Sequence, residues 1–298
     1  MQRRTFIKNT AICAVAVSAS GFIRFNGDRF VGDCETTSDI LGPFYRPGSP
    51  VRNSLLVKGD PGDLIELSGI VKHKDCITPC KQAKVELWHC SSNGVYDNTS
   101  DEFLYRGTTF SDNNGKYLFK TILPVPYNAG GGSLRPAHFH IMITAPGYQP
   151  LVTQLYFSGD PNIAKDTFAS SPNAKRRILD VKTLQNGTKK VLFDISMSVK
   201  LPAETAAIDK LTGVYINEQD KIKKIEFFTK NNTLWMKNEV FGFNFEYIGN
   251  NTFHYSGMPE GDSWTLRFEM LPTGSVKLIQ TYKIRDREKQ ISEAFKEM

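Results

Sequence analysis

Short runs of alternating or β-branched residues, separated by clusters of Asn, Asp and Gly, constrain the fold of this chain more than any other feature. Such runs predict strands, because successive side chains on a strand point to opposite faces and the turn residues end each strand. The first group of runs covers residues 64–71, 83–88, 116–122, 139–145, 152–157 and 191–199. No helical spacing separates them, so the sequence predicts an all-β chain in which they form an antiparallel β-sandwich.

A second group of runs predicts a smaller antiparallel β domain over residues 203–298. Its strands are expected at residues 211–217, 222–229, 233–236, 243–248, 252–255, 264–270 and 276–282, joined by Asn and Gly turns. Residues 288–298 predict a short terminal helix, because apolar residues recur there at helical spacing. No residue selects a role for this domain, which could bind a polymer, cover an active site or mediate assembly.

Composition and charge exclude several classes of protein. The 298 residues are 40% hydrophobic and 23% charged, unlike a disordered or collagen-like chain, and no apolar run approaches the roughly 18 to 20 residues of a membrane span. The net charge is +6, but three positive charges, Arg3, Arg4 and Lys8, lie in a stretch without acids. The basic balance therefore indicates a solvated surface and not a nucleic-acid site.

The first residues resemble a twin-arginine export signal. Arg3 and Arg4 precede Phe6, a modest apolar run at residues 11–17 and then small residues. We therefore expect residues 1–33 to be a signal peptide and linker, and the protein to be exported to the periplasm or the extracellular space. The alternative is an ordinary amphipathic first helix.

Two further segments are expected to lack regular strands. Residues 34–62 are rich in Gly and Pro and contain Gly-Pro-Phe-Tyr at 42–45, so they predict an extended arm that runs over the sandwich. Residues 160–187 form a long irregular stretch that can hold a helical turn. The arm and this stretch both belong to the predicted catalytic domain, residues 34–202.

Four cysteines remain once the signal is removed with Cys13: Cys34, Cys76, Cys80 and Cys90. An even number in an exported protein favours disulfides, and four cysteines allow three pairings among which the sequence does not choose. Cys76 and Cys80 could close a small loop, which would leave Cys34 with Cys90. A structural zinc site is a weaker interpretation of these cysteines, because the sequence has no second closely spaced Cys/His pair to complete a four-ligand zinc site.

His138 and His140 are the first candidates for a metal site. Side chains two apart on a strand point the same way, so both imidazoles would reach one site. Two histidines alone could equally be packing residues. His73, His89 and His254 have no chelating partner nearby in sequence and are interpreted as non-ligands.

Other residues in the same half of the chain make the histidine pair a more specific indication of a metal site. In chain order they are Glu86, Trp88, Gly94, Tyr96, Arg106, Gly107, Asp112, 115–117, 124–127 and 135–140. Together with 42–45, 154–157 and 193–195, this order resembles the intradiol ring-cleavage dioxygenases, the ferric enzymes that open catechols and protocatechuates. The resemblance covers residues 34–199.

The resemblance implies Fe(III) as the cofactor, with four ligands: Tyr96, Tyr127, His138 and His140. A hard trivalent cation favours anionic phenolate oxygen, and its charge can lower a tyrosine pKa from about 10 far enough for the ring to bind ionised. Tyr105 and Tyr117 are interpreted as structural, because the alternation of Tyr117 with Phe119 fits a buried strand.

The resemblance also implies roles beyond iron binding. Tyr127 is expected to leave the metal when substrate binds and to accept a substrate proton, and Arg135 to stabilise negative charge on the ring. Leu41 and Pro43 are expected in the pocket wall and Gln154 as a substrate-binding residue, although Gln154 can also be read as an ordinary polar residue of a strand.

These inferences predict a non-haem Fe(III) intradiol dioxygenase that opens a catechol-type ring with O2 to a cis,cis-muconate-type diacid. Two alternatives remain: a secreted β-sandwich binding module whose metal site is idle, and a metallohydrolase that uses the two histidines. No Gly-rich phosphate loop indicates a nucleotide cofactor. The ring substituents of the substrate and the oligomeric state, with a homodimer as one option, stay open.

Overall fold

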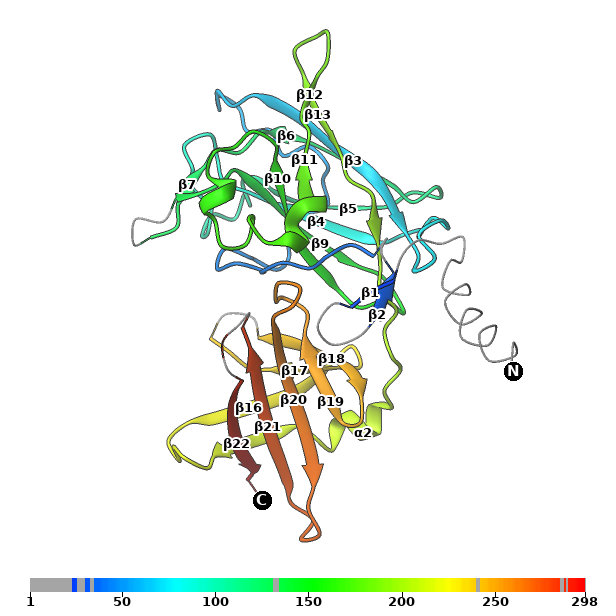
Figure 1. Cartoon of the computed structure of the whole chain (residues 1–298), viewed down its shortest axis with the longest axis vertical. Coiled ribbons are helices and arrows are strands. Elements are labelled where there is room, and N and C mark those ends of the chain that lie inside the picture. The colour runs from blue at the N-terminus through cyan, green and yellow to red at the C-terminus, as the bar shows by residue number, and fades with distance from the viewer. Residues whose placement is uncertain are drawn as a thin grey trace, which may run out of the picture.

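The computed structural model describes residues 23–25, 30–32, 35–130, 134–239, 242–284, 287 and 289–297. Figure 1 shows a β-sandwich followed along the chain by a β-barrel, so the all-β prediction is confirmed. Strands β1 (Ile23–Phe25) and β2 (Phe30–Gly32) form a separate antiparallel pair ahead of the sandwich. Within the described residues, no helix is both long and apolar enough to cross a membrane.

Two sheets build the sandwich. The first has the order β11 (Ile178–Leu179), β10 (Leu151–Phe157), β9 (His138–Thr144), β4 (Lys84–Trp88) and β5 (Arg106–Phe110). The second contains β12 (Lys182–Thr183), β13 (Lys189–Leu192), β3 (Leu64–Lys72), β14 (Ile195–Ser196) and β6 (Lys116–Ile122). Most pairings are antiparallel as expected, but β10 pairs with β11, and β3 with β13 and β14, in parallel.

The strand expected at 191–199 is divided into β13 and β14. The Phe193 carbonyl lies over Gly69 of β3, where an added Cβ would come within 1.9 Å of that oxygen. The Asp194 carboxylate accepts the Ile70 amide at 3.0 Å, so a side chain replaces one main-chain partner in the ladder. A glycine at position 69 is therefore required where the two chain segments meet.

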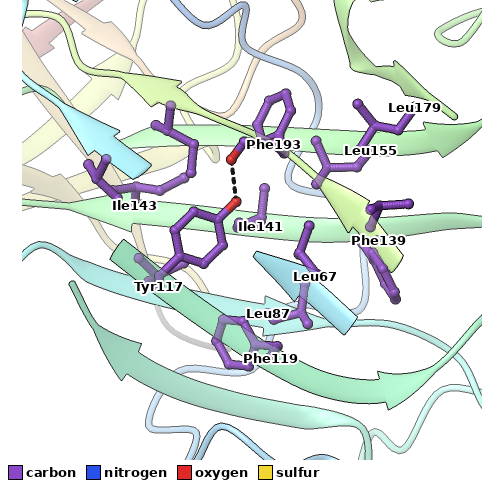
Figure 2. Packing of buried hydrophobic residues seen from close by; sticks show 14 of the residues in the cluster. Leu67, Leu87, Tyr117, Phe119, Phe139, Ile141, Ile143, Leu155, Leu179 and Phe193 are labelled. Atoms are coloured by element: carbon purple, nitrogen blue, oxygen red, sulfur yellow. Dashed lines mark hydrogen bonds between the residues drawn. The ribbon is translucent and has the colours of Figure 1, made fainter. Parts of the chain in front are cut away.

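Strict alternation decides which face of β9 enters the core. Phe139, Ile141 and Ile143 are fully buried between the sheets, and His138 and His140 therefore point to the outer face. Figure 2 shows this core, in which the Tyr117 hydroxyl donates to the Phe193 carbonyl at 2.7 Å. The interpretation of Tyr117 as a structural residue is confirmed.

The arm follows the surface of the sandwich as expected. The Asp39 amide donates to the Val152 carbonyl at 2.9 Å, and the Leu55 amide to the Lys120 carbonyl at 2.8 Å. Two short strands, β7 (Tyr127–Asn128) and β8 (Leu134–Arg135), pair beside the arm's path. The irregular stretch holds two 3-10 helices, η1 (Ile163–Lys165) and η2 (Pro172–Arg177), so its predicted helical turn is confirmed.

After the short helix α2 (Thr205–Asp209), eight antiparallel strands form a closed barrel. They are β15 (Gly213–Asn217), β16 (Lys224–Lys230), β17 (Thr233–Met236), β18 (Phe243–Gly249), β19 (Thr252–Tyr255), β20 (Ser263–Met270), β21 (Val276–Lys283) and β22 (Gln290–Lys296). Their inward side chains make an aromatic core distinct from that of the sandwich, with Tyr215, Phe227 and Phe268 packed edge to face.

The predicted terminal helix at 288–298 is wrong, because its described part is mainly strand β22. This strand pairs with β21 on one side and β15 on the other and so closes the barrel. Ala294 is buried inside, whereas Ile291 is exposed and Phe295 only partly buried. Pairing along both edges outweighs the weak local helical spacing.

Cys76 is disulfide-bonded, as favoured for an exported protein, but every predicted pairing of the four cysteines into two disulfides is wrong. Cys80 and Cys90 are free and buried, and each of the three possible pairings needs both of them. Burial raises the pKa of the Cys90 thiol to about 11, so it stays protonated at neutral pH. Cys34 and the export-signal residues Arg3 and Arg4 lie outside the described residues.

Candidate active site

The two candidate histidines begin strand β9 and share its outer face. Each is 1% exposed, and their Nε2 atoms lie 3.2 Å apart. His138 donates its Nδ1 proton to the Pro136 carbonyl at 2.7 Å, which leaves the Nε2 lone pair directed at His140. Two nitrogens directed at one point are arranged to share a cation.

Two tyrosines complete a closed group of four rings. Tyr96 follows the turn at Gly94, and Tyr127 lies on β7, where it pairs with Arg135 of β8. Ring centroids are 5.3 Å apart for Tyr96 and Tyr127, 5.5 Å for Tyr127 and His138, 4.7 Å for His138 and His140, and 5.9 Å for His140 and Tyr96. The structure therefore brings together all four side chains expected to bind the metal.

An unpaired hydroxyl in this group fits a bound metal ion. The Tyr96 hydroxyl is buried and has no hydrogen-bond partner among the described residues. Buried polar groups are nearly always satisfied, so an unpaired hydroxyl beside two imidazoles indicates a missing ligand. Two phenol oxygens and two imidazole nitrogens are a donor set suited to Fe(III).

Burial sets the protonation of these groups in the metal-free chain. It lowers the pKa of His138 to about 3 and that of His140 well below its ordinary value, so both imidazoles are neutral. Burial also raises the pKa of Tyr96 and Tyr127, although the Arg135 charge opposes the shift at Tyr127. Only a strong positive charge at the site would ionise these phenols.

Aromatic rings hold the candidate ligands in place. Trp88 lies opposite His140 in the β4–β9 register and stacks on it, with ring centroids 5.0 Å apart and planes 8° from parallel. Phe44 of the arm stacks on Tyr96 at 4.3 Å. Both contacts fix a ring before any metal binds, which lowers the entropy lost on binding.

The arm passes directly over His140 at Gly42. A Cβ at this position would lie 2.9 Å from the His140 Cε1 atom, and its φ of 75° is one that L residues rarely adopt. Leu41, expected in the pocket wall, is buried in one apolar cluster with Tyr96 and Tyr127. Pro43, expected beside it, is exposed.

Arg135 is held inside the site by a buried carboxylate. Its Nε donates to Asp166 at 2.8 Å, and its Nη2 donates to Gln154 at 3.0 Å and to the Tyr156 hydroxyl at 3.3 Å. Burial alone would lower the pKa of Arg135, but Asp166 and the nearby phenols raise it. The guanidinium is thus a permanent charge beside Tyr127.

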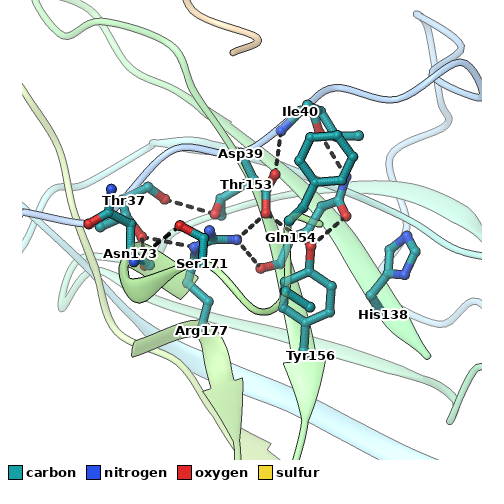
Figure 3. A network of polar contacts seen from close by, with 12 residues as sticks. Thr37, Asp39, Ile40, His138, Thr153, Gln154, Tyr156, Ser171, Asn173 and Arg177 are labelled. Carbon is teal, nitrogen blue, oxygen red and sulfur yellow. Dashed lines mark hydrogen bonds and ion pairs between the residues drawn. The ribbon is translucent and has the colours of Figure 1, made fainter. Parts of the chain in front are cut away.

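Gln154 connects this cation to the arm. It is fully buried, its Oε1 accepts from Arg135, and its Nε2 donates to the Ile40 carbonyl at 2.9 Å. Figure 3 shows how the network continues to Asp39, which pairs with Arg177 and accepts from Tyr156 at 3.0 Å. The structure therefore places Gln154 between Arg135 and the arm, with both ends of its amide in use.

Four of these residues were not assigned a role from the sequence. Asp166 lies in the irregular stretch, where no periodicity marks a buried acid, and the Asp39–Arg177 pair joins the arm to η2 across 138 positions. Gly42 was visible only as part of the Gly-Pro-Phe-Tyr run, which could have indicated a close backbone approach.

The other histidines lie apart from the four rings. His89 is fully buried, donates its Nδ1 proton to the Cys90 carbonyl at 2.7 Å, and accepts the Thr121 hydroxyl proton at Nε2 at 2.7 Å. His73 contacts the Tyr148 hydroxyl, and His254 lies on barrel strand β19. The described residues contain no group of three or more His, Cys, Asp or Glu side chains able to hold a metal.

His89 should make the protein sensitive to acid. Burial lowers its pKa from 6.5 to about 4, so between these values the unfolded chain binds a proton that the folded chain does not. The free energy of unfolding should therefore fall as the pH drops from 6.5 to 4, by on the order of 3 kcal/mol. Urea unfolding of metal-free wild type and His89→Gln at several pH values measures this. An identical pH slope in both proteins would contradict it.

Comparison with known proteins agrees with this geometry. A family model described as dioxygenase matches residues 40–201. A chlorocatechol 1,2-dioxygenase from Rhodococcus opacus is 37% identical over an alignment of 155 residues, and the match covers 44% of this chain and 60% of the relative. An intradiol ring-cleavage dioxygenase from Aspergillus niger is 30% identical over an alignment of 194 residues, and the match covers 57% of this chain and 60% of the relative.

Solved structures show the same fold. The crystal structure of 3-chlorocatechol 1,2-dioxygenase from Rhodococcus opacus 1CP superimposes with a TM-score of 0.50 and 22% identity, and the match covers 66% of this chain and 78% of that one. The two curated relatives above are matched over only about three fifths of their length. The family match spans more than half of this chain, which belongs to the intradiol ring-cleavage dioxygenase family.

Proposed function

We propose that the sandwich cleaves a catechol-type ring between its two hydroxylated carbons with O2, giving a cis,cis-muconate-type diacid. The observation that carries this proposal is the closed group of Tyr96, Tyr127, His138 and His140, in which the two Nε2 atoms face each other and the buried Tyr96 hydroxyl has no hydrogen-bond partner. The catechol and chlorocatechol dioxygenases among the relatives support the reaction class.

The cofactor that suits this donor set is Fe(III). Held by the two phenolates and two imidazoles, it would supply a Lewis acid that binds both oxygens of the diol. The protein prepares the site by keeping both imidazoles neutral and by aiming their lone pairs at one point. Trp88 and Phe44 restrict the ligand rings to this arrangement.

Tyr127 and Arg135 are the residues we assign to the chemistry. The Tyr127 phenolate oxygen would accept a proton from a substrate hydroxyl, because its ring borders the site and the adjacent Arg135 charge favours the ionised form. Arg135 would stabilise negative charge on the substrate ring, since Asp166 and Gln154 fix its guanidinium before substrate arrives.

A visible spectrum of the purified protein tests the assignment. Fe(III) bound by phenolates absorbs visible light, and anaerobic addition of catechol should shift that band; admitting O2 should then yield a diacid detectable by mass spectrometry. A coloured protein that binds catechol without consuming O2 would favour the binding module. A colourless zinc protein with hydrolase activity would favour the metallohydrolase, although the described residues provide only two histidines for that metal.

We also propose export through the twin-arginine route, on the basis of residues 3–8. Replacing Arg3 and Arg4 together by Lys should keep the protein in the cytoplasm, because the receptor recognises the guanidinium pair and not charge alone. Cell fractionation and immunoblotting measure the distribution. An unchanged periplasmic yield would contradict the proposal.

A further inference from the structure

The barrel covers part of the sheet that carries the candidate active site. Met142 and Thr144 follow His140 on the outer face of β9, and both line a cavity of about 850 Å³ between the two domains. Trp235 and Tyr255 supply barrel walls of this cavity. The barrel therefore lies on the same face of the sheet as the His138 and His140 side chains, and Figure 1 shows it next to the sandwich.

One barrel loop, residues 256–262 between β19 and β20, reaches the arm. The Gly257 carbonyl accepts the Leu41 amide at 3.4 Å, and the Glu260 amide donates to the Ser38 carbonyl at 3.3 Å. On the sandwich side, Asn173 of η2 donates its Nδ2 to the Glu260 carbonyl at 3.2 Å. The loop is thus bound to the arm and to η2 by three hydrogen bonds.

The same arm residues border the four-ring group. Leu41 packs in one cluster with Tyr96 and Tyr127, and the next residue, Gly42, lies against His140. Leu41 also lines the cavity between the domains. This side chain therefore separates the candidate active site from the space that the barrel encloses.

The sandwich itself holds the arm on both sides of Leu41. Before it, the Asp39 amide bonds to Val152 and the Asp39 carboxylate pairs with Arg177; after it, the Phe44 carbonyl accepts from Arg106 at 2.6 Å. Leu41 lies between these fixed points, and its amide is held from the barrel side. Losing the loop contact should therefore loosen the pocket wall and leave the metal ligands in place.

We propose that the loop 256–262 is a positioning element, which fixes Leu41 in the wall of the substrate pocket and thereby sets how tightly the pocket fits a catechol-type ring. The proposal rests on the proposed function and gives the barrel a role in substrate selection. In the metal-free chain, too, the loop restrains residues 38–44.

Two variants weaken the contact from opposite sides. In Gly257→Ala, the new Cβ would lie 2.4 Å from the Tyr255 hydroxyl, so the loop or that ring must move. In Asn173→Asp, the loop sequence is intact but its side-chain donor is lost. Thr273→Ala, in the β20–β21 turn at the far end of the barrel, is the control.

Hydrogen exchange of the metal-free protein provides the first measurement. Peptides covering residues 38–44 should exchange about threefold to tenfold faster in Gly257→Ala and Asn173→Asp than in wild type or Thr273→Ala. This measurement needs neither iron nor substrate, so it stays decisive if the proposed reaction is wrong. If residues 38–44 exchanged at the wild-type rate in both variants, the proposal would be overturned, whatever the variants did to catalysis.

Kinetics of the iron-loaded protein provide the second measurement. Gly257→Ala should raise KM for catechol about threefold to tenfold, with kcat and the visible band nearly unchanged, and Leu41→Ala should raise KM at least as much. The double variant should be no worse than Leu41→Ala alone, because both changes act through one side chain. Additive effects, or a loss of the visible band in Gly257→Ala, would show that the loop does not act by positioning Leu41.

Discussion

Replacing Tyr127 by Phe is expected to lower kcat for catechol roughly 10²- to 10⁴-fold while most of the iron stays bound. Phe keeps the ring that packs near Tyr96 and His138, so the shape of the site survives. The variant loses only the oxygen that would accept the substrate proton. Metal analysis together with O2 uptake measures both quantities.

Tyr117→Phe is the matched control for this change. It removes a buried hydroxyl that donates to the Phe193 carbonyl in the sandwich core, away from the four rings. Stability should fall by about 1–3 kcal/mol because that carbonyl loses its partner, but kcat should not change. If both Tyr→Phe variants lowered kcat equally, the effect would come from stability and not from the Tyr127 oxygen.

His138→Ala should behave differently from Tyr127→Phe. It removes one of the two nitrogens that face each other at 3.2 Å, so metal affinity should fall by more than the roughly 10- to 100-fold that losing an outer partner costs. Iron content after dialysis against a weak chelator measures this loss. Equal, full iron occupancy in His138→Ala and Tyr127→Phe would contradict the ligand assignment.

Residue alternation explains why most strands could be predicted. The expected strands 116–122, 233–236 and 252–255 have the observed bounds. Buried and less buried residues alternate along 116–121 and 252–255, and an Asn-Asn turn precedes 233–236. Strand β5 (Arg106–Phe110) was not predicted, since Arg-Gly-Thr-Thr-Phe lacks that alternation. It forms because Arg106 is buried by hydrogen bonds to the arm and to residues 97–98, and Gly107 lies against Leu55.

Long-range contacts explain what the sequence did not predict about the site. His138 and His140 follow from spacing, and the two tyrosines follow from the family resemblance. Asp166 has no such signal, because its partner Arg135 lies 31 positions away and only the fold of the irregular stretch joins them. The barrel residues that contact the arm lie outside the matched region, so no family pattern could indicate this contact.

Breaking the Arg135–Asp166 pair should cost the sandwich about 3–5 kcal/mol of unfolding free energy. In Asp166→Asn, the side chain keeps its shape but loses its charge, so the buried guanidinium has no counter-charge in contact. Both side chains are less than 10% exposed, and water therefore cannot replace the lost carboxylate. Burial raises the pKa of Asp166, but Arg135 and two backbone amides hold it below its ordinary value, as expected for a stabilising charge.

An exposed ion pair provides the matched control. Asp63 pairs with Lys189 at the surface, and its side chain is 67% exposed, so Asp63→Asn should cost less than about 1 kcal/mol. Urea unfolding should show separate transitions for the two domains, with only the sandwich transition shifted in Asp166→Asn. Equal small losses in both variants would mean that Arg135 tolerates the missing charge.

A double variant separates the stabilising role of this pair from its role in the reaction. Replacing Arg135 and Asp166 together by Leu removes both charges, and apolar replacement of a buried ion pair is often neutral or stabilising. Stability should therefore return toward the wild-type value, while kcat should stay low because no cation remains to stabilise the substrate ring. Recovery of both stability and kcat in this variant would show that Arg135 serves packing alone and has no part in the chemistry.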